Sequence, residues 1–163
     1  MWEKINSESE KLYHNCIKNR LTITTAESCT GGMISSAIVH INGSSQIFKS
    51  SFVTYSNDMK SKLLNISNDL IKKNGAVSEI IAFNMAKNSL KMLKANLSIA
   101  VTGIAGPTGG TIDKPVGLVW IGVGTDKKII TNKYQFNGNR LEIRQKTTYE
   151  ALKLANKVIL DFK

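Results

Sequence analysis

Ser28 is the residue with the clearest chemical potential, and it lies in the segment Thr25-Ala-Glu-Ser-Cys-Thr-Gly-Gly32. Alternating β-branched residues precede it and helically spaced apolar residues follow it, so it joins a strand to a helix. That position is the carboxyl edge of the sheet, where α/β proteins bind ligands, and free N–H groups of the helix could stabilise an oxyanion. Serine and threonine are also common helix caps, so the pattern indicates either a nucleophile or an N-cap.

A nucleophilic serine needs a base, and neither histidine is well placed to be one. His14 lies inside a predicted helix, and His40 ends a helix about three turns beyond the serine. A lysine can replace histidine when desolvation lowers its pKa. The local Ser-x-x-Lys motif is absent because Gly31 occupies its fourth position. Lys60 is the candidate for this base, and both it and Tyr55 could lie over the same sheet edge as Ser28. Judged alone, Lys60 is more simply interpreted as one of many surface lysines.

The glycine-rich loop Thr102-Gly-Ile-Ala-Gly-Pro-Thr-Gly-Gly-Thr111 is the second candidate feature, because it follows an apolar strand. Backbone N–H groups of such a loop can cradle a phosphate. The loop lacks the residue order of a Walker or dinucleotide fingerprint, so a plain turn is the alternative. Cys29 is a rival nucleophile, but the next residue of a helix points about 100° away, and we interpret it as a small buried residue. No cluster of acidic residues and histidine has metal-ligand spacing.

The elements that must position these residues alternate along the chain between strand and helix patterns. Strands are predicted at 21–25, 46–55, 97–102, 116–123 and 129–136. Helices are predicted at 4–18, 29–41, from 57 through 64, 79–94 and 139–161. This alternation indicates an α/β fold around one sheet, and a hairpin between 116 and 136 would make that sheet mixed. We expect residues 1–163 to form a single domain.

Composition and charge set the broad class of the protein. The 163 residues are 42% hydrophobic and carry a net charge of +10, mostly from scattered lysines. The clustered arginines and interleaved aromatic residues of nucleic-acid binders are missing, so we expect solvated lysine faces or attraction of a small anionic substrate, and no specific nucleic acid. No apolar run reaches the ~20 residues of a membrane span. No secretory signal and no Cys-x-x-Cys motif occur, which favours a cytoplasmic protein without membrane partners.

Several motifs in the same order resemble the CinA C-terminal domain, the nicotinamide-nucleotide amidohydrolase family. They are Thr25–Gly32, Tyr55-Ser-Asn57 with Lys60, Gly75-Ala-Val-Ser-Glu79, Met85-Ala86, Val101–Thr111 with Lys114-Pro-Val-Gly117, and Phe136-x-Gly-x-Arg140 with Arg144. The resemblance covers roughly residues 5–160. It implies a three-layer α/β/α sandwich with a mixed, mostly parallel sheet.

The resemblance also implies a reaction, namely hydrolysis of the carboxamide of nicotinamide mononucleotide to nicotinate mononucleotide and ammonia. Ser28 would be the nucleophile, Lys60 its base and Tyr55 a positioning hydrogen bonder, with no metal and no cofactor. There are two alternatives. One is a non-catalytic nucleotide-binding or interaction module of the competence/damage-inducible type, and the other is an amidase that acts on another substrate. Many relatives carry an N-terminal pyrophosphatase-type domain, whose activity we do not expect here.

The same resemblance predicts which residues bind the nucleotide and how subunits assemble. The predicted substrate-binding residues are Glu27, Thr30, Gly31, Gly32, Thr102, Gly103, Gly106, Gly109, Gly110 and Arg140. The glycine loop and Arg140 would hold the phosphate, the arginine acting either in its own subunit or across an interface. We expect a homodimer or a larger homo-oligomer.

Overall fold

A mixed five-stranded sheet forms the centre of the computed structural model, which describes residues 1–160. The strands follow the order β2-β1-β3-β4-β5. They span β1 (Ile23–Glu27), β2 (Phe48–Val53), β3 (Leu97–Gly103), β4 (Leu118–Gly124) and β5 (Ile129–Gln135). β1 pairs in parallel with β2 and β3, whereas β4 runs antiparallel to β3 and β5. Four strands thus share one direction, which confirms the predicted mixed, mostly parallel sheet and its hairpin.

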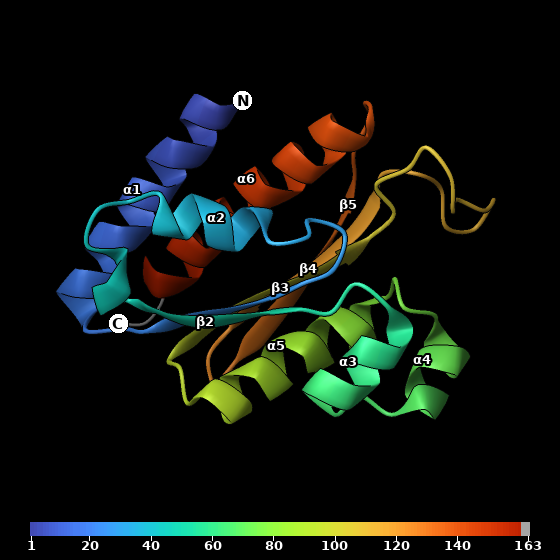
Figure 1. Cartoon of the computed structure of the whole chain (residues 1–163), viewed down its shortest axis with the longest axis horizontal. Coiled ribbons are helices and arrows are strands. Elements are labelled where there is room, and N and C mark those ends of the chain that lie inside the picture. The colour runs from blue at the N-terminus through green and yellow to red at the C-terminus, as the bar shows by residue number, and fades with distance from the viewer. Residues whose placement is uncertain (161–163) are drawn as a thin grey trace.

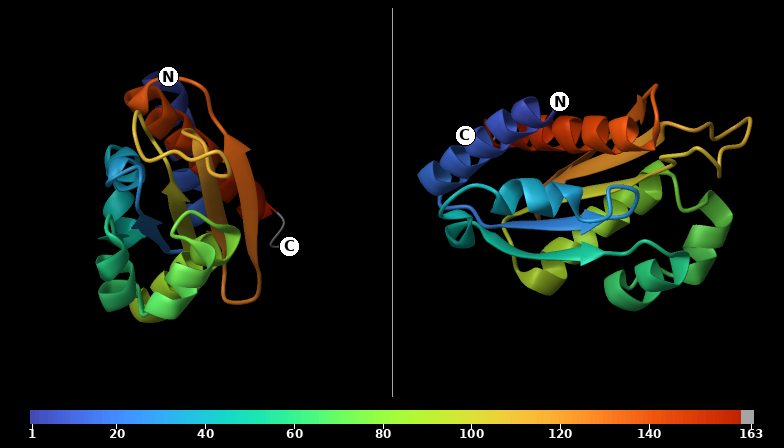
Figure 2. Two further views of the ribbon diagram at one scale, coloured as in Figure 1. Left: turned by 90° about the vertical axis from the view of Figure 1, so that its right-hand side faces the viewer. Right: turned by 45° about the horizontal axis from the view of Figure 1, so that its top comes forward.

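Helices cover both faces of the sheet, so the predicted three-layer sandwich is also confirmed (Figure 1, Figure 2). One face carries α1 (Trp2–Asn19), α2 (Met33–Val39) and α6 (Arg140–Leu160). The other carries α3 (Asn57–Leu64), α4 (Asn68–Asn74) and α5 (Glu79–Leu93). A short 3₁₀ turn, η1 (Ser44–Gln46), precedes β2. Among these helices none has the length and apolar character that a bilayer crossing requires.

The inner strands are buried on both faces, and alternate residues divide between two hydrophobic clusters. Ile99, Val101 and Ile121 pack under α1, α2 and α6, whereas Ala100 packs under α5. Ala26 and Ala100 of the sheet face α5, and a Cβ at Gly122 would lie 2.8 Å from the backbone oxygen of Ala82 in α5. This close approach explains why glycine interrupts an otherwise apolar strand.

Element boundaries differ from the sequence prediction where turns intervene. The first strand ends at Glu27, two residues later than predicted, and α2 begins at Met33 instead of residue 29. Residues 28–32 form a tight turn in which Gly31 and Gly32 have φ of 59° and 91°, a conformation that suits glycine. Helix α4 was not predicted, because its seven residues bury only Ile71. The predicted end of α6 at residue 161 lies outside the described residues.

The connections place three strand ends at one edge. The chain passes from β1 through α2 to β2 on one face, and then through α3, α4 and α5 on the other face to β3. The order of strands therefore reverses between β1 and β3, and such a switch point opens a crevice at the carboxyl ends. Ser28 follows β1, Lys60 follows β2, and the glycine loop follows β3.

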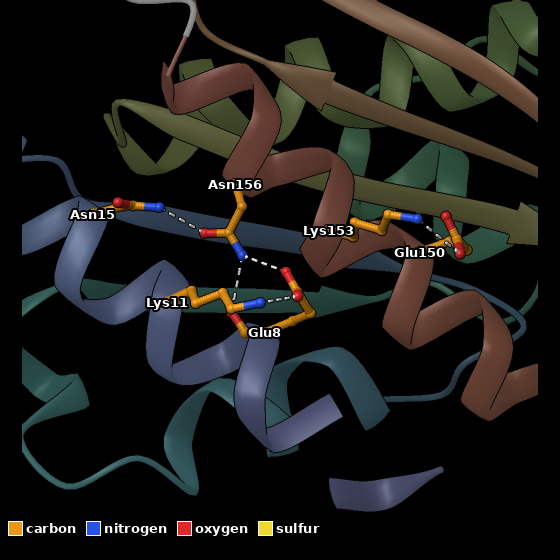
Figure 3. Close-up of polar contacts among 6 residues, drawn as sticks. All are labelled: Glu8, Lys11, Asn15, Glu150, Lys153 and Asn156. Atoms are coloured by element: carbon orange, nitrogen blue, oxygen red, sulfur yellow. Dashed lines mark hydrogen bonds and ion pairs between the residues drawn. The ribbon is translucent and has the colours of Figure 1, made fainter. Parts of the chain in front are cut away.

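Buried polar contacts fasten the first helix to the last (Figure 3). The Asn156 side chain in α6 donates to the Glu8 backbone oxygen at 3.0 Å and to Glu8 Oε2 at 2.9 Å, and it accepts from Asn15 Nδ2 at 2.9 Å. Lys11 Nζ donates to the other oxygen of Glu8 at 2.7 Å. Because Glu8 and Asn156 are buried, their partners compensate for lost hydration.

Replacing Asn156 by alanine should therefore destabilise the fold by about 1–3 kcal/mol, since Glu8 would lose buried donors. Urea denaturation followed by circular dichroism measures this. Asn84→Ala is the matched control, because Asn84 donates only to Ile80 within an exposed part of α5, and its effect should stay within about 0.5 kcal/mol. Equal stability of the two variants would contradict the interpretation.

Candidate active site

A direct contact joins the two residues that sequence reasoning paired. Lys60 Nζ donates to Ser28 Oγ at 3.0 Å and to the Thr54 backbone oxygen at 2.9 Å. Ser28 is held at the end of β1 by its own N–H, which donates to Val101 O at 3.1 Å. The Ser56 side chain caps α3 by accepting from Met59 N, which fixes where the helix begins and so where the lysine points.

Burial changes the acid–base character of this lysine. Only 1% of Lys60 is exposed, and desolvation lowers its pKa from 10.5 to about 8. No carboxylate within residues 1–160 forms an ion pair with it that would offset this effect. At pH 7 roughly a tenth of the amine is neutral, and that form can accept a proton. The pair has the geometry and the proton affinity required for a nucleophile and its base.

Glu27 requires a correction, because its carboxylate is fully buried and lies outside the pocket beside Ser28. Its oxygens accept from the backbone N–H groups of Gly32, Ile34 and Ser35 at 3.0, 3.1 and 2.8 Å. They also accept from the side chains of Thr30 and Ser35. The carboxylate thus caps α2 and fixes the turn after β1, and it neither contacts Lys60 nor has an open face for substrate.

The turn itself is held from outside by the last helix. Thr30 is buried, and its backbone oxygen accepts from Arg144 Nε at 3.2 Å and from Arg144 Nη2 at 2.7 Å. Thr30, Gly31 and Gly32 therefore shape the turn, and none of the three lines the pocket beside Ser28. The substrate contact expected of them stays a prediction. Arg144 was matched as part of a motif, but its position in α6 provided no signal for this contact.

A pocket of about 300 Å³ opens beside Ser28 at the carboxyl edge. The structure brings Tyr55, Gly103, Gly106, Gly109 and Arg140 to its wall, as the sequence indicated. Four further lining residues were not predicted as substrate contacts, namely Cys29, Ile104, Ala105 and Thr108.

Two further residues predicted to bind substrate do not line this pocket. Thr102 is buried and its hydroxyl donates to Ala76 O at 2.8 Å, whereas Gly110 is exposed and a Cβ there would lie 2.8 Å from Val116 N.

Arg140 ties three parts of the site together. Its Nη2 donates to the Tyr55 hydroxyl at 2.6 Å, and its Nη1 donates to Gly106 O at 2.8 Å. Tyr55 is 58% exposed, and within the described chain it makes no hydrogen bond to Ser28 or Lys60. The tyrosine and the arginine therefore form the rim of the pocket, next to the serine–lysine pair.

Cys29 lines the pocket as an unreactive thiol. It is buried, and burial raises its pKa to about 12, so it stays protonated near neutral pH. This agrees with its interpretation as a small buried residue. In the part of the chain that the structure describes, no three His, Cys, Asp or Glu side chains gather to hold a metal.

The fold and the site together define the class of protein: it is a mixed α/β sandwich with a buried serine–lysine pair at its switch point. Residues 5–159 match the family model of the CinA C-terminal domain, and the chain belongs to this family.

Relatives and solved structures agree with this membership. CinA-like proteins of Prochlorococcus marinus (strain MIT 9312) and Endomicrobium trichonymphae are 54% identical over 130 residues and 46% identical over 144 residues. These alignments cover 78% and 88% of this chain but 31% and 34% of the relatives. The chain thus spans about a third of the length of the curated relatives it matches.

The backbone agrees with two crystal structures. The competence/damage inducible protein CihA from Agrobacterium tumefaciens superposes with a TM-score of 0.93 at 36% identity, covering 95% of both chains. A CinA superfamily protein from Escherichia coli superposes with a TM-score of 0.89 at 32% identity, covering 96% of this chain and 90% of the other.

Replacing Glu27 by glutamine should destabilise the protein by about 2–3 kcal/mol, because an amide NH₂ would face donors that need a charged acceptor. Equilibrium unfolding in urea measures the change. Glu79→Gln is the control, since its carboxylate accepts from Thr131 in an exposed contact and should contribute less than about 1 kcal/mol. Wild-type stability of Glu27→Gln would exclude the capping role.

Proposed function

We propose that this chain is an amidohydrolase that converts nicotinamide mononucleotide to nicotinate mononucleotide and ammonia through Ser28 and Lys60. The observation that carries the proposal is the 3.0 Å contact between a buried lysine amine and a serine hydroxyl. The substrate is inferred from the resemblance to the nicotinamide-nucleotide amidohydrolase family, whereas the serine–lysine pair supports the nucleophilic attack that the reaction needs.

Acylation would begin from the neutral form of Lys60. The amine accepts the proton of the Ser28 hydroxyl while Oγ attacks the carboxamide carbon. The tetrahedral intermediate collapses as its C–N bond breaks, and the Lys60 ammonium gives its proton to the leaving nitrogen. Ammonia departs and the acyl group remains on Ser28 as an ester.

Deacylation reverses these roles with water. Lys60, neutral again, accepts a proton from the attacking water, and the second tetrahedral intermediate forms at the same carbon. The ester C–O bond then breaks and the proton returns to Ser28 Oγ. The product is nicotinate mononucleotide, whose carboxylic acid loses its proton at neutral pH.

The turn after Ser28 supports an oxyanion site. Within residues 1–160 the backbone N–H of Cys29 donates to no other residue, and it directly follows the nucleophile. In serine hydrolases the N–H at that position is a common donor to the developing oxyanion. Glu27 and Arg144 hold the turn on either side, so this donor is in place before substrate arrives.

The rim of the pocket suits a phosphorylated ligand. A guanidinium has five N–H donors, and Arg140 donates two of them to Tyr55 and Gly106. The remaining donors and the glycine loop could hold the phosphate, and the ~300 Å³ pocket lies at the lower end of the range for small-molecule sites.

A cytoplasmic location and a homo-oligomeric state remain predictions.

Purified protein should release ammonia from nicotinamide mononucleotide, and Ser28→Ala should lower the rate at least 1,000-fold because no nucleophile remains. A coupled ammonia assay measures both. Ser36→Ala is the matched control, since this serine is exposed on α2, and its rate should stay within twofold of wild type.

Binding of the nucleotide without turnover would overturn the proposal and favour a non-catalytic module. Turnover that persists unchanged in Ser28→Ala would overturn the assigned nucleophile.

The rate should depend on pH through Lys60. Because its pKa is lowered to about 8, kcat/KM should rise about tenfold per pH unit below 8 and level off above it. Lys60→Met should lose this activity at every pH. A profile that is flat from pH 6 to 9 would contradict the role of this lysine as base.

The same shift predicts a stability effect that does not depend on substrate. In the unfolded chain the lysine keeps its proton up to about pH 10.5, whereas in the fold it loses it near pH 8. Burial of the ammonium therefore costs stability below pH 8, and that cost declines between about pH 8 and 10.5. Wild type should gain stability relative to Lys60→Met over this window in urea denaturation.

A further inference from the structure

A wide cavity lies at the end of the sheet opposite to Ser28. It measures about 1020 Å³ and is formed by the last turns of α5, the start of β3 and the turn between β4 and β5. In Figure 1 these segments meet at the lower left of the molecule, away from the loops that carry the serine–lysine pair. The proposed amidase chemistry makes no use of this end of the sheet.

Five lysines line this cavity, and they come from two separate parts of the sequence. Lys87, Lys91 and Lys94 belong to the end of α5, whereas Lys127 and Lys128 belong to the β4–β5 turn. More than thirty residues separate the two groups along the chain, and the tertiary structure brings them to one place. We call the cavity that they surround the lysine cleft.

The lysines of the cleft are not neutralised by neighbouring carboxylates. Asp126 is the one acidic residue in the lining, and no ion pair within residues 1–160 includes any of the five lysines. All five are exposed. Ammonium groups gathered around one hollow repel each other, and a bound anion would relieve that repulsion.

Helix capping accounts for only part of this charge. Lys91 lies in the last turn of α5 and Lys94 is its C-cap, where a cation complements the partial negative charge of the helix end. Lys127 and Lys128 lie in the turn between β4 and β5, so the end of α5 does not explain their presence.

The floor of the lysine cleft is apolar. Leu21, Phe83, Leu90, Ala95 and Ile129 contribute to it, and Phe83 is half-buried. A hollow with an apolar floor and a cationic rim matches a ligand whose flat apolar part bears several negative charges. Inorganic anions would use only the rim.

We propose that the lysine cleft binds a small aromatic molecule that carries two or more phosphate groups, the chemistry of a nucleoside polyphosphate. The base would lie on Phe83 and the apolar floor, and the phosphates would contact the amines of α5 and of the β4–β5 turn. A nucleic acid strand fits less well, because the lining has a single aromatic ring and no arginine, whereas strand-binding grooves stack successive bases.

Calorimetric titration with ATP as the probe tests this site. Binding to the wild-type protein should be detectable at a Kd below about 1 mM, and inorganic tripolyphosphate should bind at least tenfold more weakly because it lacks a base. Raising KCl from 50 to 300 mM should weaken ATP binding, since the rim acts through charge. No binding of ATP at 5 mM, or equal affinity for tripolyphosphate, would overturn the proposal.

Paired variants locate the site. Lys127→Gln/Lys128→Gln should weaken ATP binding at least tenfold. Lys72→Gln/Lys73→Gln is the matched control, because it removes the same charge from an adjacent exposed pair at the end of α4, outside the cleft. Its affinity should stay within twofold of wild type, and an equal loss in both variants would show non-specific attraction and reject the site.

Competition separates this site from the proposed active site. Nicotinamide mononucleotide at saturating concentration should leave ATP affinity unchanged, and ATP binding should persist in Ser28→Ala. Mutual displacement would place ATP in the pocket beside Ser28 and reject the lysine cleft. A thymidine oligonucleotide that displaces ATP at a lower concentration than ADP does would replace the proposal by nucleic-acid binding. Ammonia release is a separate measurement, so either proposal can fail without the other.

Discussion

Burial of the Lys60 amine against the Ser28 hydroxyl is the constraint on which the candidate site depends. A lysine at 1% exposure with no carboxylate partner is unfavourable while it is charged, and its lowered pKa is the direct expression of that cost. The fold tolerates it because two acceptors, Ser28 Oγ and Thr54 O, remain beside the nitrogen. Burial of the ammonium lowers the stability of the fold, and it also makes the amine easier to deprotonate near physiological pH.

Glu27, the residue before Ser28, is buried under different conditions from Lys60. Its carboxyl group accepts hydrogen bonds from backbone and hydroxyl donors, which compensate for its burial. A saturated group of this kind makes a rigid anchor, and it holds the turn in which Ser28 lies. The site therefore combines a buried carboxyl group whose hydrogen bonds are satisfied with a buried amine whose pKa is lowered.

The last helix connects this site to the rest of the molecule. Arg144 and Arg140, one turn apart in α6, reach the turn after β1 and the loop after β3. Farther along the same helix, Asn156 binds α1 through Glu8. Residues that are far from the pocket thus determine how α6 lies, and through the two arginines they determine the shape of the pocket rim.

Much of this protein follows from local sequence alone. Apolar periodicity indicated most helices and strands, and residue types marked Ser28 as a candidate that could be either a nucleophile or a helix cap. These signals come from interactions between residues close in the chain, which act in the same way in any fold. The short helix α4 escaped prediction because it buries too little to leave a pattern.

Only the tertiary structure decided what depends on contacts across the chain. The parallel pairing of β1 with β2 puts the residues after these strands side by side, so that Ser28 and Lys60, 32 positions apart, lie at 3.0 Å. Burial at that place lowers the lysine pKa. Tertiary contacts also revealed Glu27 as a helix cap, and they brought two groups of lysines together around one cleft. Burial and proximity depend on how the strands are ordered, and periodicity carries no information about that order.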